Sequence, residues 1–323
     1  MRRNNESVHY TFMINRVLIR IKVVQILYAY YKGDGNSLPV AEKELFFSIE
    51  KTYDLYFHLL ALSVEITRYA ALRIDAKRNK FRPSPEDLNP NTCFIDNKFI
   101  AQLTKNESLN EYLKKKKLTW GNDGDIVKEL YEEIISTEFY AEYMNQASES
   151  YADDKELWRK IYKKVILTSE GLDNSIEEQS IYWTDDIEIV ISFIIKTIKR
   201  FEENSGKQQE LLPMFKEEED AEFARKLLRS ILSNNVEYRK IIDRYTKNWE
   251  LDRIAFMDIV IMEVALAELM NFPTIPVNVT FNEYIEISKM YSTDKSSTFI
   301  NGVLDKIVNE LKKDNKLIKV VRI

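Results

Sequence analysis

Residues 296–307 read SSTFINGVLDKI and carry the densest helical signal in this 323-residue chain. They open with hydroxyl side chains, which can cap a helix. Apolar residues then recur at the three- and four-residue spacing of an amphipathic helix. Gly302 interrupts this pattern at a cost of about 1 kcal/mol relative to alanine, so we expect close packing or a close backbone approach there as compensation. The apolar positions are Phe299, Ile300, Val303, Leu304, Ile307, Val308 and Leu311.

Two further helices are predicted directly before this one. Residues 251–269 are apolar on nearly every side, which is typical of a helix at the centre of a core. The Phe272-Pro273-Thr274-Ile275-Pro276 break ends that helix, because proline cannot continue it. Pro276 then suits the first turn of another helix over residues 276–291. The C-terminal part of the chain is therefore predicted to be a group of packed helices.

Composition supports an all-α fold and argues against several kinds of site. The chain has only 7 Gly and 7 Pro among long stretches of helical periodicity. Its length suits one large domain or two. A single cysteine, Cys93, excludes an internal disulfide and a cysteine cluster for zinc. His9 and His58 are the only histidines, which argues against a histidine metal site or a catalytic triad.

No motif in the chain implies a reaction. There is no glycine-rich phosphate loop, and adjacent carboxylates on a helix point about 100° apart, so they form no catalytic pair unaided. We therefore expect no enzyme activity, no cofactor and no metal. The polar, charged beginning and the lack of a membrane-length apolar run predict a cytoplasmic protein. The net charge of -5 means that any nucleic-acid site must be a local basic patch.

A local excess of positive charge lies near the beginning of the chain. A helix is predicted over residues 16–31, with Asn15 as its cap. Arg16 and Arg20 are four residues apart and share a face, while Lys22 lies further round. Charge alone leaves two interpretations open, because these residues suit either a solvated rim of a core helix or contacts to phosphates.

The C-terminal stretch resembles the C-terminal half of the NusB family of bacterial transcription antitermination factors. The matching pieces keep their order and spacing over about 65 residues, which makes the match specific. In the first helix, Arg20 with Val24-Gln25 and Leu27-Tyr28 resembles the basic first helix of that family. The C-terminal pieces are Trp249 with Leu251 and Arg253, Ala265–Leu269, Ile275–Val277, Asn282-Glu283 with Ile285–Ile287, and Phe299–Lys306.

The resemblance implies an all-α protein whose core is a NusB-like antiparallel helical bundle. It also implies an RNA-binding antitermination factor that pairs with the ribosomal protein NusE on boxA-type single-stranded RNA. Such a complex joins the RNA polymerase elongation complex and helps it read through terminators, notably in rRNA operons. The alternative is a helical protein–protein interaction module with little RNA affinity. The acidic net charge and the apolar residues 17–19 within the basic run favour that alternative.

The resemblance and the local charge together predict the RNA contacts. Arg16, Arg20 and Lys22 are expected at phosphates. Tyr245, Phe299 and Asn301 are expected at bases or sugars, although Phe299 suits a core position equally well. Family members commonly have a basic residue near position 298, and Lys295 is expected to supply that charge here. The RNA-binding set is therefore Arg16, Arg20, Lys22, Tyr245, Lys295, Phe299 and Asn301.

Two positions match family residues that meet the ribosomal-protein partner, namely Tyr28 and Asp258. Asp258 lies within an apolar stretch, and burying its charge unpaired would be costly. It must therefore reach solvent, pair internally or meet a partner.

The family core is much shorter than this chain, which predicts a helical insertion. Met13 is a candidate start, because the helical pattern begins directly after it. Trp120, Trp158 and Trp183 are expected in the core of the insertion. The expected parts are 1–34 (leader and first basic helix), 35–215 (helical insertion), 216–313 (main NusB-like core) and 314–323 (basic tail).

Overall fold

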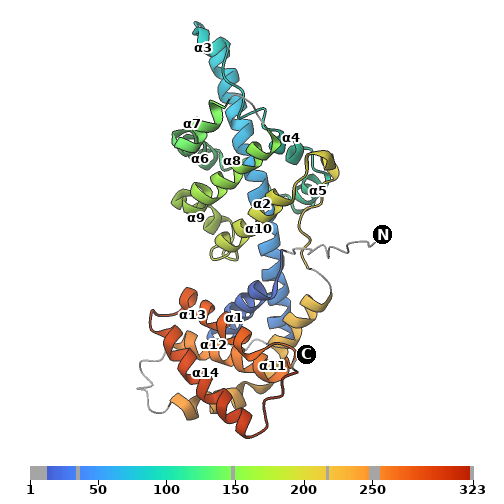
Figure 1. The fold of residues 1–323 in the computed structure, drawn as a ribbon, viewed down its shortest axis with the longest axis vertical. Helices are drawn as coiled ribbons and strands as arrows, with labels where there is room; N and C mark the ends of the chain where they lie inside the picture. The colour runs from blue at the N-terminus through green and yellow to red at the C-terminus, as the bar shows by residue number, and fades with distance from the viewer. Residues whose placement is uncertain (1–12, 34–36, 147–149, 216–217, 247–254, 321–323) are drawn as a thin grey trace, which may run out of the picture. The chain divides into compact units, whose positions relative to one another are not determined.

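A computed structural model of the chain describes residues 13–33, 37–146, 150–215, 218–246 and 255–320. Every secondary-structure element in these residues is a helix, as Figure 1 shows, and this confirms the all-α prediction. Within the same residues, no helix combines the length and the apolar character needed to cross a membrane.

The helices follow one another with short connections. Two are 3-10 helices, and the remainder are α-helices. In chain order they are α1 (Arg16–Lys32), α2 (Leu38–Arg78), α3 (Pro85–Leu88), α4 (Lys98–Thr104), α5 (Glu107–Lys116), α6 (Gly124–Ser136), α7 (Glu138–Met144), α8 (Tyr151–Lys164), η1 (Ile166–Thr168), α9 (Glu170–Gln179), α10 (Ile187–Arg200), η2 (Glu203–Gln208), α11 (Glu218–Thr246), α12 (Phe256–Asn271), α13 (Val277–Tyr291) and α14 (Ser296–Lys313).

The chain divides into two compact units. Unit 1 contains Glu50–Met214, and unit 2 contains Ile14–Ile49 and Phe215–Ile323. Helix α2 contributes residues to both, because the division falls between Ile49 and Glu50. We propose that unit 2 corresponds to the family core and that unit 1 corresponds to the insertion, with the boundary inside α2 instead of at residue 35.

Helix α12 lies at the centre of unit 2. It packs against α1, α11, α13 and α14, and the residues of its middle turns are buried on every side. This confirms that the apolar stretch is central, although residues 247–254 lie outside the described residues. Helix α1 is buried to a similar degree and packs on α11 and α12. Unit 2 therefore has two helices with almost no exposed face.

The helix starts test two local predictions. The Asn15 side chain accepts a hydrogen bond of 2.9 Å from the backbone N–H of Leu18, which confirms the predicted cap of α1. The predicted hydroxyl cap of α14 is wrong, because Lys295 occupies the cap position and makes no side-chain cap bond. The Ser296 hydroxyl instead accepts a 3.1 Å hydrogen bond from the backbone N–H of Thr293, so it closes the preceding turn.

Gly302 is not held by close packing, contrary to the expectation. A Cβ atom built at this position would meet no atom within 4 Å. The glycine therefore leaves an open spot on the exposed face of α14, and no described residue packs close enough to compensate its propensity cost.

Unit 1 has an aromatic core along the second part of α2. Trp120, Trp158 and Trp183 are all buried, which confirms their predicted place in the core. The Tyr162 hydroxyl donates a 2.7 Å hydrogen bond to the Leu59 carbonyl oxygen. The Nε1 atoms of Trp120 and Trp183 donate to carbonyl oxygens of α2 in the same way, whereas that of Trp158 has no hydrogen-bond partner among the described residues.

Candidate RNA and partner interface

Arg20, the expected phosphate contact of α1, is buried in unit 2. Its side chain is 3% exposed, and that of Glu268 on α12 is 0% exposed. The Arg20 Nε and Nη2 atoms donate to the two Glu268 carboxylate oxygens over 2.7 Å and 3.0 Å. Burial alone would lower the pKa of Arg20, but the hydrogen bond to Glu268 and the charges of Glu268, Tyr284 and Glu283 together outweigh burial, so the pKa is raised. The guanidinium therefore stays charged inside the core.

Helix α13 completes the hydrogen bonding of this carboxylate. The Thr280 hydroxyl donates to Glu268 Oε1 over 2.8 Å, and the Tyr284 hydroxyl donates to Oε2 over 3.1 Å. A third contact reaches the arginine, because Glu283 Oε2 lies 3.6 Å from Arg20 Nη1. Buried charges are tolerated when they are paired and fully hydrogen-bonded, so Arg20 joins α1, α12 and α13.

The burial of α1 corrects two of the expected phosphate contacts. Arg20 and Lys22 are only 3% and 1% exposed, so neither side chain reaches the surface. Arg16 is the exposed cation of the three, with its guanidinium 5.1 Å from the centre of the Phe223 ring. Its Nε atom lies 3.9 Å from Asp220 Oδ1, so α11 partly neutralises it. Of the three expected phosphate contacts on α1, only Arg16 is therefore exposed.

A pocket on α14 brings two of the expected RNA residues together. Its volume is about 480 Å³, and it holds Lys295 and Phe299 beside the open spot at Gly302. Lys306, which was not predicted as a site residue, closes the same pocket one helical turn further on. Phe299 is half-buried and lines the pocket. The lining residues are Asp294, Lys295, Thr298, Phe299, Gly302, Val303 and Lys306.

The chemistry of the α14 pocket suits an anionic ligand with a flat apolar part. Two lysines face one carboxylate, Asp294, and within the described residues neither Lys295 nor Lys306 forms an ion pair. Their ammonium groups are therefore available to phosphates, and Phe299 contributes an aromatic side chain to the pocket lining. Single-stranded RNA combines these two properties.

The structure does not bring the other expected RNA residues into this pocket. Asn301 is exposed but does not line it. The Tyr245 hydroxyl on α11 donates to the Glu310 carboxylate, which lies about 16 Å along α14 from Phe299 at 1.5 Å per residue. A bound strand would have to run along α14 to meet both Phe299 and Tyr245.

Asp258, one of the two expected partner residues, is paired inside unit 2. It is 4% exposed, and its Oδ1 atom accepts a 2.6 Å hydrogen bond from the Ser292 hydroxyl. The Ser296 hydroxyl in turn donates to Ser292 Oγ over 3.1 Å. Of the three alternatives for this carboxylate, the structure shows the internal pair, so a direct partner contact is not supported.

Tyr28, the other expected partner residue, lies in a half-exposed aromatic cluster. Its ring centre is 5.6 Å from that of Phe256 on α12. The Lys32 ammonium lies 4.7 Å from the centre of the Phe256 ring and 5.8 Å from that of Tyr28. This cluster of Tyr28, Lys32 and Phe256 combines aromatic surface with an exposed cation, which is a composition suited to protein binding.

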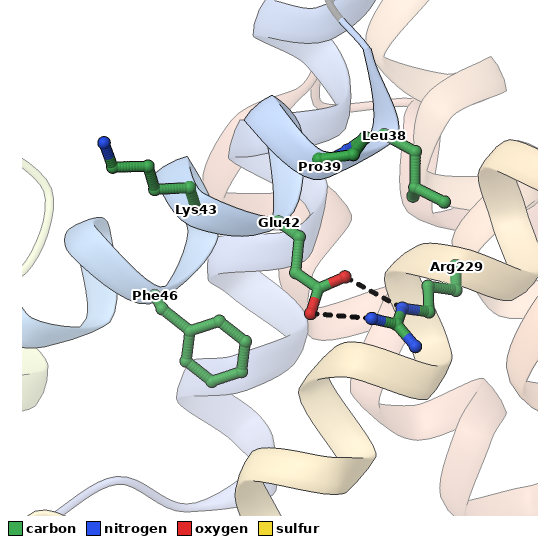
Figure 2. A pocket seen from close by; sticks show the side chains of 6 residues that line it. All are labelled: Leu38, Pro39, Glu42, Lys43, Phe46 and Arg229. Carbon is green, nitrogen blue, oxygen red and sulfur yellow. Dashed lines mark hydrogen bonds and ion pairs between the residues drawn. The ribbon is translucent and has the colours of Figure 1, made fainter.

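A second pocket of unit 2 differs from the α14 pocket in its charges. It has a volume of about 470 Å³ and is lined by Leu38, Pro39, Glu42, Lys43, Phe46 and Arg229. Figure 2 shows the Glu42 carboxylate facing Arg229, whose Nε and Nη2 donate to it over 2.8 Å and 3.0 Å. Because these two charges satisfy each other, this pocket is less suited to a phosphate than the α14 pocket.

Two features of the site escaped the sequence reasoning. Glu268, the partner of Arg20, is 248 residues away in the chain, and no local pattern connects the two. Lys306 could have been found, because its spacing of four residues from Gly302 and seven from Phe299 places it on the same helical face.

Comparisons with known proteins agree with this fold. The model of the NusB family matches residues 188–309. The transcription antitermination protein NusB of Salinibacter ruber is 35% identical over 135 residues, which cover 40% of this chain and 84% of the relative. NusB of Chloroherpeton thalassium is 42% identical over 98 residues (30% and 46% of the two chains), and NusB of Natranaerobius thermophilus is 40% identical over 81 residues (25% and 58%). The match thus covers less than two thirds of the length of the Chloroherpeton and Natranaerobius proteins.

One solved structure also matches. NusB of T. maritima shares 28% identity, with 43% of this chain and 85% of that chain covered and a TM-score of 0.28. The helices and the sequence relatives define the class of this molecule as an all-α protein with a NusB-like core. The chain belongs to the NusB family, whose relatives named above are transcription antitermination proteins.

Proposed function

We propose that this chain is a transcription antitermination factor that acts by assembly on RNA, without making or breaking a bond. It binds boxA-type single-stranded RNA together with the ribosomal protein NusE. The complex joins the RNA polymerase elongation complex and favours read-through of terminators, notably in rRNA operons. This proposal is supported by membership of the NusB family, which rests on the family match over residues 188–309 and on the relatives named above.

The α14 pocket is the observation that carries the RNA part of the proposal. Lys295 and Lys306 lie on either side of a half-buried Phe299, and Gly302 leaves space between them. We assign phosphate contacts to the two lysines and base stacking to Phe299. Arg16, Asn301 and Tyr245 remain proposed contacts for a strand that extends beyond the pocket. Arg20 holds the helices that support the pocket, since Glu268 neutralises its charge.

The Tyr28 cluster carries the partner part of the proposal. Aromatic residues beside a cation are enriched where proteins bind one another. We assign the NusE contact to Tyr28, Lys32 and Phe256. Tyr28→Ala should weaken NusE binding at least tenfold, because hot-spot aromatics typically contribute more than about 2 kcal/mol. A half-exposed residue can be truncated with little effect on the melting temperature, so loss of both binding and fold would contradict this assignment.

The RNA proposal is tested by titrating a labelled boxA-type RNA with the full chain, with and without NusE, at several salt concentrations. Lys295→Gln with Lys306→Gln should reduce the slope of log K against log salt by about 1.4, the value for two phosphates on a single strand. The matched control is Lys312→Gln with Lys313→Gln, which removes the same charge from exposed positions on the same helix. Equal slopes for the two double variants would overturn the assignment.

A second candidate is a helical protein–protein interaction module with little RNA affinity. The burial of Arg20 and Lys22 favours it, because two of the three expected phosphate contacts on α1 are lost to the core. The same titration separates the candidates. A chain that binds NusE at micromolar concentration and shows no salt-dependent RNA binding in its presence would be such a module.

A further inference from the structure

The last two residues of α2 in unit 1 and the turn that follows them have the sequence KRNKFR, residues 77–82, here called the 77–82 tip. Phe81 within it is 95% exposed, more than any other large apolar side chain of the described residues. In Figure 1 the end of α2 and the neighbouring α3 extend beyond the other helices of unit 1. Leaving a whole phenylalanine in water forgoes about 2 kcal/mol or more of burial, and nothing in the packing of unit 1 requires it.

Positive charge surrounds this phenylalanine. The tip has four cations and no carboxylate, in a chain with a net charge of -5. Lys80 pairs with Asp87 on α3 over 3.1 Å. Within the described part of the chain, Lys77, Arg78 and Arg82 form no ion pair, and all three are exposed. The tip is therefore a local basic patch of the kind that a nucleic-acid site on an acidic protein requires.

The backbone around the tip is held in place. The Ser84 hydroxyl accepts from the Asp87 N–H, and the Asp87 carboxylate accepts from the Ser84 N–H, both over 3.1 Å. Because Asp87 also binds Lys80, this capping box of α3 ties α3 to the end of α2. The Arg82 guanidinium lies 5.8 Å from the centre of the Phe81 ring. The ring and the cations are thus presented together before any ligand arrives, which lowers the cost of binding.

We propose that the 77–82 tip is a second RNA contact, separate from the α14 pocket. One unpaired base stacks on Phe81, and Lys77, Arg78 and Arg82 bind the phosphates next to it. Single-stranded RNA is the ligand that uses an exposed ring and exposed cations at once, since its bases offer flat faces and its backbone offers charge. The tip lies outside residues 188–309, which match the family, so this inference goes beyond the proposed function.

The stacking part is tested by fluorescence anisotropy with the full chain and a labelled oligouridine of about 12 nucleotides. Phe81→Ala should weaken binding about tenfold, because stacking on an aromatic side chain contributes roughly 1–3 kcal/mol per base. Phe81→Tyr should restore it, since the ring is kept. Phe81→Leu should not, although it keeps an apolar side chain. Wild-type affinity in Phe81→Leu would overturn the stacking assignment. All three variants should melt like the wild type, because Phe81 packs against little.

The charge part is tested by Lys77→Gln with Arg78→Gln. This variant should reduce the salt slope by about 1.4 and weaken binding to the same oligouridine. The matched control is Lys114→Gln with Lys115→Gln, which removes the same charge from exposed positions on α5 of the same unit. A control that weakens binding as much as the tip variant would show a nonspecific charge effect and would overturn the proposal.

Two further arms separate this inference from its alternatives. Vesicles containing phosphatidylserine replace the RNA in one arm. Vesicle binding that depends on Phe81, with unchanged RNA binding in the tip variants, would show a membrane-surface contact and overturn the RNA proposal. The other arm runs Lys295→Gln with Lys306→Gln in parallel. Loss of oligouridine binding in the Lys295/Lys306 variant alone would overturn the assignment of an RNA contact to the tip. Loss of this binding in the tip variants alone would support the tip and would exclude the α14 pocket as the oligouridine site.

Discussion

Arg20 at the N-terminal end of α1 and Glu268 on α12 form a two-point ion pair inside unit 2, although 248 residues separate them in the chain. The pair fixes how the first helix docks on the central one. The Arg20 charge is balanced by Glu268 within the core. Arg20, which the sequence analysis assigned to an RNA phosphate, therefore stabilises the packing of α1 on α12 instead.

Glu268→Ala should destabilise the protein by about 3–5 kcal/mol, because it leaves the Arg20 guanidinium buried without a counter-charge. Urea denaturation followed by circular dichroism measures this loss. The control is Glu286→Ala, which removes one partner of the exposed Glu286–Lys289 pair and should cost less than about 1 kcal/mol. Similar losses in both variants would show that the buried pair has no special role.

Asp258→Lys should also destabilise unit 2, by about 3 kcal/mol or more. The new ammonium would replace a carboxylate that is 4% exposed and accepts a hydrogen bond from the Ser292 hydroxyl, and a buried ammonium cannot accept that bond. Asp258→Asn keeps an acceptor oxygen for Ser292 and should cost much less. Thermal melts of the two variants test this directly, and an unchanged melting temperature in Asp258→Lys would restore the earlier expectation of a surface-exposed partner contact.

His58 should make the stability of unit 1 sensitive to acid. Its ring is stacked 4.0 Å from Trp120 and 5.3 Å from Trp183, and burial lowers the pKa of His58 to about 4, against a weaker opposing effect of Gln179. The folded state therefore takes up this proton less readily than the unfolded state, whose pKa is 6.5. The contribution of neutral His58 to the free energy of unfolding is complete above about pH 6.5 and is lost as the pH falls towards 4.

The loss between pH 7 and about pH 4.5 should be roughly 2–3 kcal/mol, at 1.36 kcal/mol for each pH unit. His58→Phe removes the titrating group and keeps an aromatic ring between the two tryptophans. Urea titrations at both pH values measure the difference in free energy of unfolding between wild type and variant. The contributions of carboxylates cancel in this difference, because they titrate in both proteins. A difference that does not change with pH would refute the assignment.

Gly302 should separate stability from RNA binding. Gly302→Ala should stabilise α14 by about 0.5–1 kcal/mol, because its Cβ meets no atom within 4 Å and alanine is the better helix former. Gly302→Leu should fold equally well but fill the space beside Phe299 and weaken RNA binding several-fold. Thermal melts and the boxA titration together check this contrast. Full RNA affinity in Gly302→Leu would mean that the RNA does not enter the pocket.

Local patterns in the sequence predicted α1, α12, α13 and α14. Asn15 caps α1 as expected, and the apolar stretch of α12 is central. Helix α9 shows the limit of such patterns, because only Leu172 and Ile176 of its ten residues are buried and such a short polar segment shows little periodicity. Apolar periodicity therefore predicts a helix that buries a broad face, and it does not predict a short helix that buries only two side chains.

The candidate site was harder to predict than the fold. Lys295 and Phe299 lie in one pocket because they are four residues apart on one helix. The burial of Arg20 depends instead on Glu268, and that of Asp258 on Ser292, and both contacts form only when distant helices pack. The spacing of charges along one helix does not show whether a carboxylate on another helix will pair with a cation. Exposed and buried cations therefore have the same pattern in the sequence.

The most direct test of the proposed function is a transcription assay with purified RNA polymerase and NusE. One template carries a boxA sequence upstream of a terminator, and the other carries the same sequence scrambled. The full chain should raise read-through on the boxA template alone, Lys295→Gln with Lys306→Gln should lose this effect, and Lys312→Gln with Lys313→Gln should keep it. Unchanged read-through, or an equal rise on both templates, would contradict the account.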